Sequence, residues 1–273
     1  MKKLLIVLLM SVLPIVFWSC SDDDDNNPVN PAVKNYFPLS VGSYWVYEKY
    51  TLDSNNNRIS TSLVVDSAYC KSTAQEIIND VTQNIYTLAH FSSNLTNPDQ
   101  EFYVYNDQIY QKYQLAPGID LSAFGVNVND YLNLDWMLLI DQKNSSWISY
   151  PQKSLELPAI SFPNVGDVIL TLILKLDGTS KGDGSYVLNN KPISTKDYEL
   201  DWTVSGTAKI PSLGAIGSAI PIPEFKLQTI YKLADGIGIV NIVTDSQKVS
   251  ILNLISFQFP GSEQNLIRYN IAK

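Results

Sequence analysis

Apolar and polar residues alternate along much of the chain after residue 36. The clearest runs are 45–50, 58–69, 85–91, 224–233 and 248–259. Each run is rich in β-branched or aromatic residues and is bounded by Gly, Pro, Asn or Asp, which is typical of β-strands. Because successive side chains on a strand point to opposite faces, the alternation predicts strands with one buried face and one polar face.

Short polar segments between these runs predict tight turns. Asn106 and Asp107 separate two tyrosine-rich runs and indicate a hairpin. Further turns are predicted at 53–57, 187–191 and 235–238. Helix signals are scarce: residues 73–76 match a capping box and permit one short helix, although a turn between strands fits equally well.

Two stretches of the second half depart from simple alternation. Residues 168–176 are apolar on both faces except at Thr171 and Lys175. This predicts a strand covered on both sides, or one whose face lines an apolar cavity. Residues 210–223 are apolar but interrupted by Pro and Gly, so no regular element can occupy all of them. We expect a loop across the core or an exposed apolar lip that contacts another molecule.

These patterns predict an all-β protein. We expect a meandering antiparallel sheet, curved into a half-barrel or lipocalin-like shape, with a β-sandwich as the alternative. Residues 36–273 suffice for one such domain. The sequence Phe-Pro-Leu-Ser-Val-Gly at 37–42 returns as Phe-Pro-Asn-Val-Gly at 162–166. This echo indicates two sheet halves, 36–156 and 157–273, although a chance match of common turn formers explains it equally well.

The chain begins with an apolar segment of another kind. Lys2 and Lys3 precede an apolar run, 4–18, that ends at the small residue Ser19. This is the layout of a secretory signal peptide, and the run is shorter than the ~20 residues that a membrane-spanning helix needs. We therefore expect residues 1–19 to be a signal peptide that is removed during export.

The residues around the end of this signal resemble a lipid-attachment site. Phe17-Trp18-Ser19-Cys20 is similar to the lipobox of bacterial lipoproteins, in which the cysteine is acylated and becomes the first residue of the mature chain. The resemblance implies that Cys20 carries lipid, palmitate for example, and that the membrane is a partner through this residue. Two or more acyl chains hold a protein stably at a membrane.

An acidic run follows the cysteine within a polar segment, 20–35, that is too charged to be buried and is expected to be a flexible tether. The run consists of Asp22, Asp23, Asp24 and Asp25. It resembles the signal by which lipoproteins of the Bacteroidota are displayed on the outer face of the outer membrane. A plain acidic linker after ordinary secretion is the alternative.

Charge and cysteine content narrow the function classes. The formal net charge is −8, and it becomes −10 when Lys2 and Lys3 leave with the signal peptide. Such a surface repels phosphates, so nucleic acid is not an expected partner. If Cys20 is acylated, Cys70 has no intramolecular disulfide partner, and its strand-like surroundings predict a small buried side chain.

Three segments in chain order resemble a broad set of envelope lipoproteins. The first is Tyr-Phe-Pro-Leu at 36–39 followed by Gly42, Trp45 and Tyr47. The second is Trp-Met-Leu-Leu at 136–139, and the third is the glycine-containing segment 231–240. The resemblance implies a meandering antiparallel sheet that curves into a half-barrel, and it assigns no reaction.

Residues that usually carry enzyme chemistry are sparse. His90 is the only histidine, and its position on the run 85–91 predicts a hydrogen-bonded structural role. One His with few Cys does not supply the ligands of the usual zinc sites, so we expect no metal. The sequence contains no phosphate-binding motif that would indicate a cofactor and no serine-hydrolase motif that would indicate a catalytic triad. We therefore expect no catalytic residues and no cofactor.

Two groups of side chains remain as candidates for binding or catalysis. Asp197, Glu199 and Asp201 share one strand face, about 7 Å apart, as glycoside hydrolysis could use; a solvated strand face is the simpler explanation. Four tyrosines crowd one hairpin: Tyr103, Tyr105, Tyr110 and Tyr113. Exposed tyrosines bind sugars or protein partners, whereas in a sheet they more often pair across strands in the core.

The sequence thus predicts a lipid-anchored protein of the outer membrane, exposed on the cell surface and without enzymatic activity. Its expected role is binding or envelope assembly, with a glycan, lipid or protein as the ligand. A carrier of lipophilic molecules is one alternative, and a glycan-binding protein or glycan hydrolase is another. An apolar cavity lined by residues 168–176 would favour the carrier, a flat tyrosine platform the glycan binder, and a cleft with paired carboxylates the hydrolase.

Overall fold

The computed structural model describes residues 34–92, 99–112, 136–162, 166–217, 220–251 and 255–273, and these residues are almost entirely β-strand. The strands are β1 (Tyr44–Leu52), β2 (Val64–Ile78), β3 (Val81–Ser92), β4 (Gln100–Tyr105), β5 (Gln108–Lys112), β6 (Trp136–Asp141), β7 (Ser146–Glu156), β8 (Ile160–Phe162), β9 (Gly166–Leu188), β10 (Lys191–Lys209), β11 (Ile220–Ala234), β12 (Gly238–Thr244), β13 (Gln247–Ile251), β14 (Ile255–Phe259) and β15 (Gly261–Asn270). Two short 3-10 segments, η1 (Ser60–Ser62) and η4 (Pro211–Gly217), complete the described elements. No helix in the described ranges is long and apolar enough to cross a membrane.

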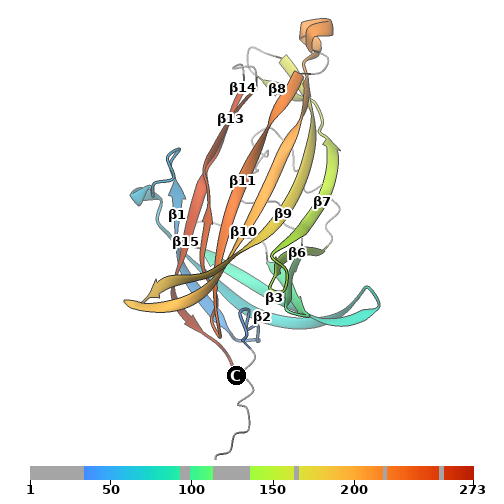
Figure 1. The fold of residues 1–273 in the computed structure, drawn as a ribbon. Helices are drawn as coiled ribbons and strands as arrows, with labels where there is room; N and C mark the ends of the chain where they lie inside the picture. Colours follow the sequence, from blue (N-terminus) through green and yellow to red (C-terminus); the bar gives the residue numbers. More distant parts are fainter. Residues whose placement is uncertain (1–33, 93–98, 113–135, 163–165, 218–219, 252–254) are drawn as a thin grey trace, which may run out of the picture. The chain divides into compact units, whose positions relative to one another are not determined.

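The compact unit Lys34–Lys273 is built on one antiparallel sheet. The strand order is β6-β5-β4-β3-β2-β1-β15-β12-β11-β10-β9-β7, with β8 paired to β9, while β13 and β14 form a separate ribbon (Figure 1). Most neighbours are also consecutive in the sequence, which makes the sheet a meander. The prediction of an all-β half-barrel is confirmed, and a β-sandwich is not what the chain forms.

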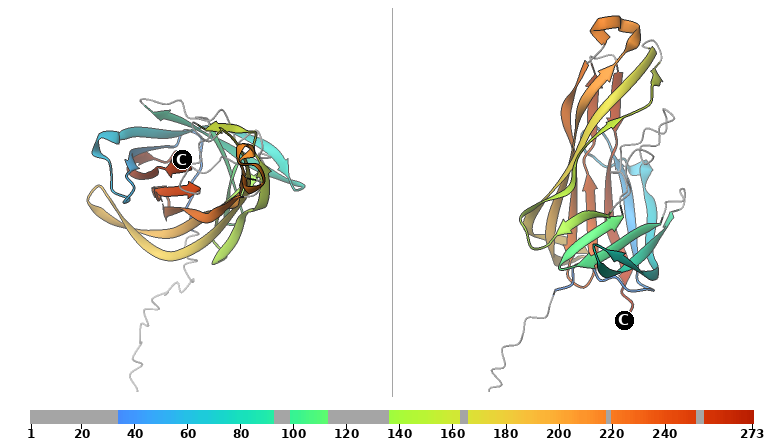
Figure 2. Two further views of the ribbon diagram at one scale, coloured as in Figure 1. Left: turned by 90° about the horizontal axis from the view of Figure 1, so that it is seen from above. Right: turned by 90° about the vertical axis from the view of Figure 1, so that its right-hand side faces the viewer.

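The sheet curls until its two end strands meet (Figure 2). β6 and β7 are joined by the short turn 142–145, yet they share no backbone ladder. Side chains link them instead: Trp147 Nε1 and Ser149 Oγ both donate hydrogen bonds to the carbonyl oxygen of Leu138. Twisted sheets of many strands close or curl because each strand is rotated relative to its neighbour.

Two-residue turns of Asn and Asp connect several of the long strands. The central residues Asn106 and Asp107 have φ of 51° and 60°, and Asn189 and Asn190 have 51° and 62°. Both hairpins were predicted, and both use the left-handed turn geometry that matches the twist of the flanking strands. Asn and Asp tolerate that geometry better than other non-glycine residues do.

The short helix that the capping box at 73–76 permits does not form. β2 continues through this segment to Ile78, and its residues pair with β3 up to Ile78 opposite Val81. The reversal comes later, at Asn79 and Asp80, which have φ of 50° and 62°. Backbone hydrogen bonds to β3 and the β-branched residues here outweigh a local capping signal.

The core lies along the inner face of the curled sheet. On β9, Val168, Leu170, Leu172, Leu174 and Leu176 are buried, and the alternate residues are partly exposed. One face of this strand is therefore covered, and the second face is only partly shielded. Of residues 210–223, the last four begin β11, with Ile220 and Ile222 buried, while η4 follows β10 at one tip of the sheet, where Leu213 is exposed and Gly214 has φ of 60°.

Two of the segments that resemble envelope lipoproteins, 36–47 and 231–240, contact each other. Trp45 Nε1 donates to the carbonyl oxygen of Ile237 at 2.6 Å, and Tyr47 Oη donates to that of Ile239 at 2.9 Å. The tight reversal between β11 and β12 was predicted; it is formed by Gly236 and Gly238, with φ of 69° and 101°, where side chains are disfavoured. The aromatic residues of β1 thereby fix the β11–β12 turn.

Candidate functional site

A pocket of about 320 Å³ opens on the concave face of the half-barrel. This volume lies at the lower end of the range for small-molecule sites, roughly 300–1,000 Å³. The pocket is lined by Phe37, Leu39, Trp45, Tyr47, Lys49, Asp66, Ala68, Leu88, His90, Gln100, Phe102, Gln111, Met137, Leu139, Leu176, Leu200, Trp202, Thr229, Tyr231, Gly238, Ile239, Ile242 and Gln264. The lining therefore comes from strands on both sides of the β1–β15 pair. The three segments that resemble envelope lipoproteins, 36–47, 136–139 and 231–240, each contribute to it.

Aromatic and aliphatic side chains form most of the wall. Trp45 and Tyr47 are two residues apart on β1 and so face the same side as the pocket. Phe37 packs against Phe102 on the opposite side, with ring centroids 5.3 Å apart. Burial, followed by the nearby Asp66 carboxylate, raises the pKa of Tyr47 above the usual range, so this hydroxyl stays protonated. Burial raises the pKa of Tyr231 to about 12.

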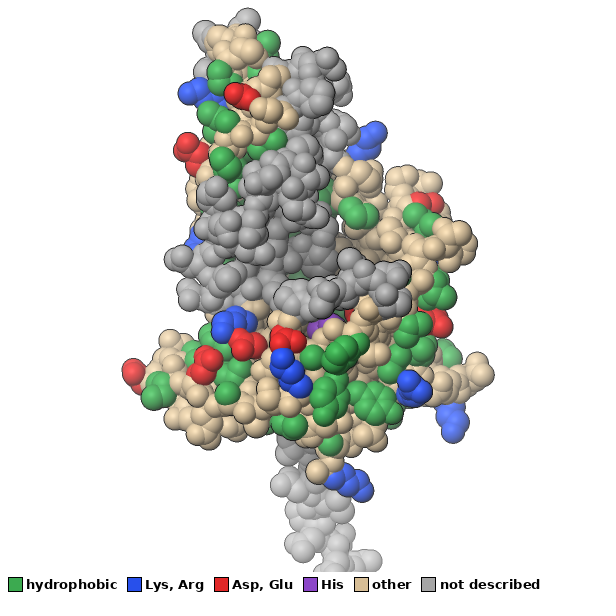
Figure 3. All heavy atoms as spheres, turned by 180° about the vertical axis from the view of Figure 1, so that it is seen from behind, with side chains coloured by type: hydrophobic (Ala, Val, Ile, Leu, Met, Phe, Trp, Pro, Cys, Tyr) green, Lys and Arg blue, Asp and Glu red, His purple; other side chains and the backbone are tan. Residues whose placement is uncertain are grey.

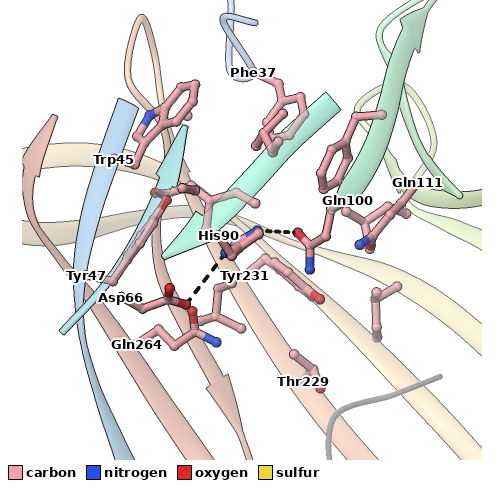
Figure 4. A pocket seen from close by; sticks show the side chains of 18 of the residues that line it. Phe37, Trp45, Tyr47, Asp66, His90, Gln100, Gln111, Thr229, Tyr231 and Gln264 are labelled. Carbon is pink, nitrogen blue, oxygen red and sulfur yellow. Dashed lines mark hydrogen bonds and ion pairs between the residues drawn. The ribbon is translucent and has the colours of Figure 1, made fainter. Parts of the chain in front are cut away.

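The polar part of the wall centres on Asp66 and His90. Asp66 Oδ2 lies 3.6 Å from His90 Nδ1, and His90 Nε2 is 3.0 Å from Gln100 Oε1 (Figure 4). Strand register explains the cluster: Ala68 of β2 is opposite His90 of β3, which places Asp66 and His90 on the same inner face of adjacent strands. The chain's single histidine is visible from outside in Figure 3, and its side chain is 14% exposed.

Asp66 has one carboxylate oxygen without a partner. The residue is 5% exposed, and Oδ1 is buried with no hydrogen-bond donor among the residues that the structure describes. Leaving a buried acceptor unsatisfied costs about 1–3 kcal/mol, and more when the group is charged. Such a cost in a pocket wall is removed when a ligand brings a donor to the site.

His90 has the hydrogen bond that the sequence predicts, but its position in a pocket was not foreseen. The sequence analysis also missed Asp66 as a site residue. A signal was present in the sequence. Asp66, Ala68 and Cys70 occupy every second position, so they share one face of the strand, and the small side chains of Ala68 and Cys70 indicate that this face is buried. Cys70 is buried as predicted, and burial raises the pKa of its thiol.

The four candidate tyrosines do not act as one group. Tyr103 is 4% exposed and stacks on Tyr110, with parallel rings 4.4 Å apart, and burial raises its pKa to about 12. Tyr105 is 40% exposed, and Tyr113 lies outside the described residues. Tyr103 and Tyr110 are thus a packed cross-strand pair on β4 and β5.

The three candidate carboxylates lie on the face of β10 opposite the buried Leu200 and Trp202. Each faces a lysine: Lys232 Nζ is 2.5 Å from Asp197, Lys181 Nζ is 3.1 Å from Glu199, and Lys226 Nζ is 3.5 Å from Asp201. Carboxylates paired in this way hold surface strands together and are poorly placed for acid–base work in the pocket. The side chains of Asp197, Glu199 and Asp201 are 15%, 14% and 21% exposed, so this outer face is covered by its lysine partners and is not the solvated face of the simpler explanation.

Metal ligands are not gathered anywhere in the described part of the chain, where no group of three or more His, Cys, Asp or Glu side chains could hold an ion. Among residues 168–176, only Leu176 belongs to the pocket lining. Cys20 and the acidic residues Asp22, Asp23, Asp24 and Asp25 lie outside the described residues.

Comparison with known proteins finds structural likeness without sequence likeness. No protein-family model and no curated protein matches the chain. A presumed lipoprotein from Parabacteroides distasonis is similar with a TM-score of 0.45 and 11% identity, over 87% of this chain and 99% of that one. A presumed exported protein with a YmcC-like fold from Bacteroides fragilis is similar with a TM-score of 0.36 and 8% identity, again over 87% and 99% of the two chains.

Proposed function

We propose that this chain is a lipid-anchored cell-envelope protein whose half-barrel binds a small, largely apolar molecule. Binding rather than catalysis is the proposed activity, and the ligand is carried or sensed in the concave pocket. The signal-like segment, 1–19, and the lipobox-like Cys20 support the envelope assignment. The outer membrane, and within it the cell surface, is the proposed location because of the acidic run after Cys20.

The pocket is the observation that carries this proposal. A cavity of about 320 Å³ with mainly aromatic and aliphatic walls and a few convergent polar groups is the usual form of a small-molecule site. Its walls include residues as far apart in sequence as Phe37 and Gln264. Protein cores are closely packed and contain few voids larger than a water molecule. A pocket of this size on the inner face of the sheet is therefore expected to serve for binding.

The glycan-binding and hydrolase alternatives have less support. A sugar platform needs exposed aromatic faces, whereas Tyr103 is buried against Tyr110. A glycosidase needs two carboxylates across a cleft, whereas Asp197 and Asp201 face lysines on the outer side of β10. A carrier of lipophilic molecules therefore fits the pocket best. The pocket wall differs from the one expected because, of residues 168–176, only Leu176 lines the pocket.

Filling the pocket tests the proposal. Ala68 lines the pocket from β2, and its neighbour Ser67 points to the opposite face of the same strand. The probe is N-phenyl-1-naphthylamine, a neutral dye that fluoresces in apolar surroundings. The full chain with Cys20→Ala is used, so that its own acyl groups cannot enter the pocket. We expect saturable dye binding that Ala68→Leu weakens about tenfold or more, equivalent to about 1.4 kcal/mol.

Ser67→Leu is the matched control, because it adds the same side chain one residue away on the outer face. Its dye affinity should equal that of the parent. Equal affinity for all three proteins, or no saturable binding by the parent, would contradict the assignment of the pocket as the binding site.

A further inference from the structure

Three polar groups of the pocket wall, those of Trp45, Tyr47 and Thr229, already have hydrogen-bond partners, whereas one acceptor has none among the described residues. Trp45 Nε1 and Tyr47 Oη donate to backbone carbonyls of the β11–β12 turn and of β12. The hydroxyls of Thr229 and Thr244 bond each other at 3.1 Å. Asp66 Oδ1, in contrast, is buried and has no donor within the described part of the chain. The wall therefore offers an acceptor, and what would complete it is a donor.

We propose that the ligand of this pocket is an organic cation, a protonated amine on an apolar body, whose ammonium group meets the Asp66 carboxylate. This inference rests on the proposed function, since it names the ligand class for the same pocket. Hydrogen bonds between an ammonium and a carboxylate are roughly twice as strong as neutral ones. A neutral hydroxyl would satisfy the same oxygen less well.

Aromatic side chains in the same pocket lining favour the same class of ligand. Trp45, Tyr47, Phe102, Trp202 and Tyr231 all belong to the pocket lining. The faces of such rings are negative, and cages of aromatic side chains are a common way to bind amines and quaternary ammonium groups. A buried carboxylate within an aromatic wall combines both attractions at one site.

A histidine and a lysine set the limits of this site. His90 approaches Asp66 through Oδ2 and is also held by Gln100, which leaves Oδ1 uncontacted. Lys49 follows Tyr47 by two residues on β1 and lines the pocket, where it is half-buried. An anionic ligand would be attracted by Lys49 and repelled by Asp66, whereas a cationic ligand would be attracted by Asp66. The charge of the ligand that binds more tightly therefore shows which of the two residues dominates binding.

Three probes of matched shape test the charge preference: 4-phenylbutylamine, 4-phenylbutanol and 4-phenylbutyrate. Each is titrated into the full chain carrying Cys20→Ala, and tryptophan fluorescence is followed because Trp45 and Trp202 line the pocket. We expect the amine to bind at least about tenfold more tightly than the alcohol, and the alcohol more tightly than the acid. Asp66→Asn should bring the amine to the affinity of the alcohol and leave the alcohol unchanged.

The outcomes distinguish the two proposals. Equal binding of all three probes, or tightest binding of the acid, would overturn the cation inference while the pocket remains a binding site. No binding of any probe would overturn the pocket itself. If Asp66→Asn fails to fold, the order of the three probes on the parent chain still decides the charge preference. Retention of the full amine preference by a folded Asp66→Asn chain would also overturn the inference.

Discussion

The carboxylate of Asp141 accepts four hydrogen bonds although the residue is only 1% exposed. Its donors are Gln108 Nε2 at 2.7 Å, the backbone N–H of Lys143 at 2.8 Å, and both the backbone N–H and Nδ2 of Asn144 at 3.1 and 2.7 Å. Burial alone would raise the pKa of Asp141, but the bonds from Asn144, Gln108 and the backbone outweigh it and hold the pKa below the usual value. This network fixes the turn between β6 and β7, where the sheet ends meet.

The lowered pKa of Asp141 predicts a loss of stability in acid. The unfolded-state value is about 3.9, so this contribution is fully present above that pH and is lost as pH falls through the lower folded-state pKa. We expect Asp141→Asn to lower the free energy of unfolding at pH 7 by about 1–3 kcal/mol, measured by urea unfolding. The difference from the parent should shrink below about pH 4.

Asp107→Asn is the control for this prediction. Its side chain is 61% exposed, and its ion pair with Lys143 spans 3.5 Å at the surface. Surface pairs contribute little, so this variant should unfold within about 0.5 kcal/mol of the parent. A gap between parent and Asp141→Asn that stays constant from pH 7 to pH 3 would show that the carboxylate charge is not the cause.

Single residues were predictable from sequence where their role is local. Asn106, Asp107 and Gly236 form turns because their own backbone preferences favour left-handed geometry. Asp66 could not be identified as a site residue in the same way. Its importance comes from His90 on the next strand and from residues such as Trp202, more than 130 positions away, which only the folded sheet brings to the pocket.

Strand β15 connects the two sides of the sheet. It pairs with β1 along one edge and with β12 along the other. Leu266, which is 1% exposed, is opposite Tyr47 and accepts a hydrogen bond at its carbonyl oxygen from Tyr186. Ile267 is the next residue, is the extra residue of a β-bulge in the pairing with β1, and is 37% exposed. The two neighbours therefore occupy opposite environments on one strand.

This contrast gives a test of the strand's role. Leu266→Asp places a carboxylate in the core beside Tyr47, and we expect a loss of at least about 3 kcal/mol in the free energy of unfolding. Circular dichroism during urea unfolding measures the loss. Ile267→Asp carries the same charge at the exposed position and should change stability by less than about 1 kcal/mol. Comparable losses in the two variants would mean that the core does not extend across β15.

The strands themselves were largely predictable, because alternation of side chains is a local signal. The capping box at 73–76 shows the limit of such signals because, of the two alternatives that it left open, the helix does not form and the turn between strands does, at Asn79 and Asp80. Thr73 and Glu76 satisfy a capping pattern, but pairing of β2 with β3 as far as Ile78 places each residue of the segment opposite a residue of β3 and holds the chain extended. Strand order is likewise invisible locally, since the pairing of β1 with β15 joins segments more than 200 residues apart.

For the whole molecule, the attachment of the folded unit is the main untested prediction. We expect Cys20→Ala to move the protein from the membrane fraction to the soluble fraction of the cell envelope, because the anchor proposed above is the set of acyl chains on Cys20. Fractionation followed by immunoblotting measures the distribution. The expected change is a nearly complete shift rather than a partial one, since two or more acyl chains are what gives stable anchoring and the variant would carry none.

Cys70→Ala provides the control for the anchor. Cys70 is fully buried within the described unit and has no access to acylating enzymes in the folded state. Its replacement by another small residue should leave the protein in the membrane fraction. Membrane association that survives Cys20→Ala would mean that something other than lipid on this residue holds the protein.

The pairing of β1 with β15 also sets an order in time. The earliest strand cannot gain its second neighbour until the last strand has been made, and the pocket, which needs Gln264 opposite Lys49, stays incomplete until then. A chain that is synthesised from its amino end would thus keep β1 without its β15 neighbour until synthesis ends. In this unfolded form it would fit through a narrow translocation channel. For a chain exported as proposed, the pocket would close only after passage, and the proposed ligand would first be bound on the far side of the membrane.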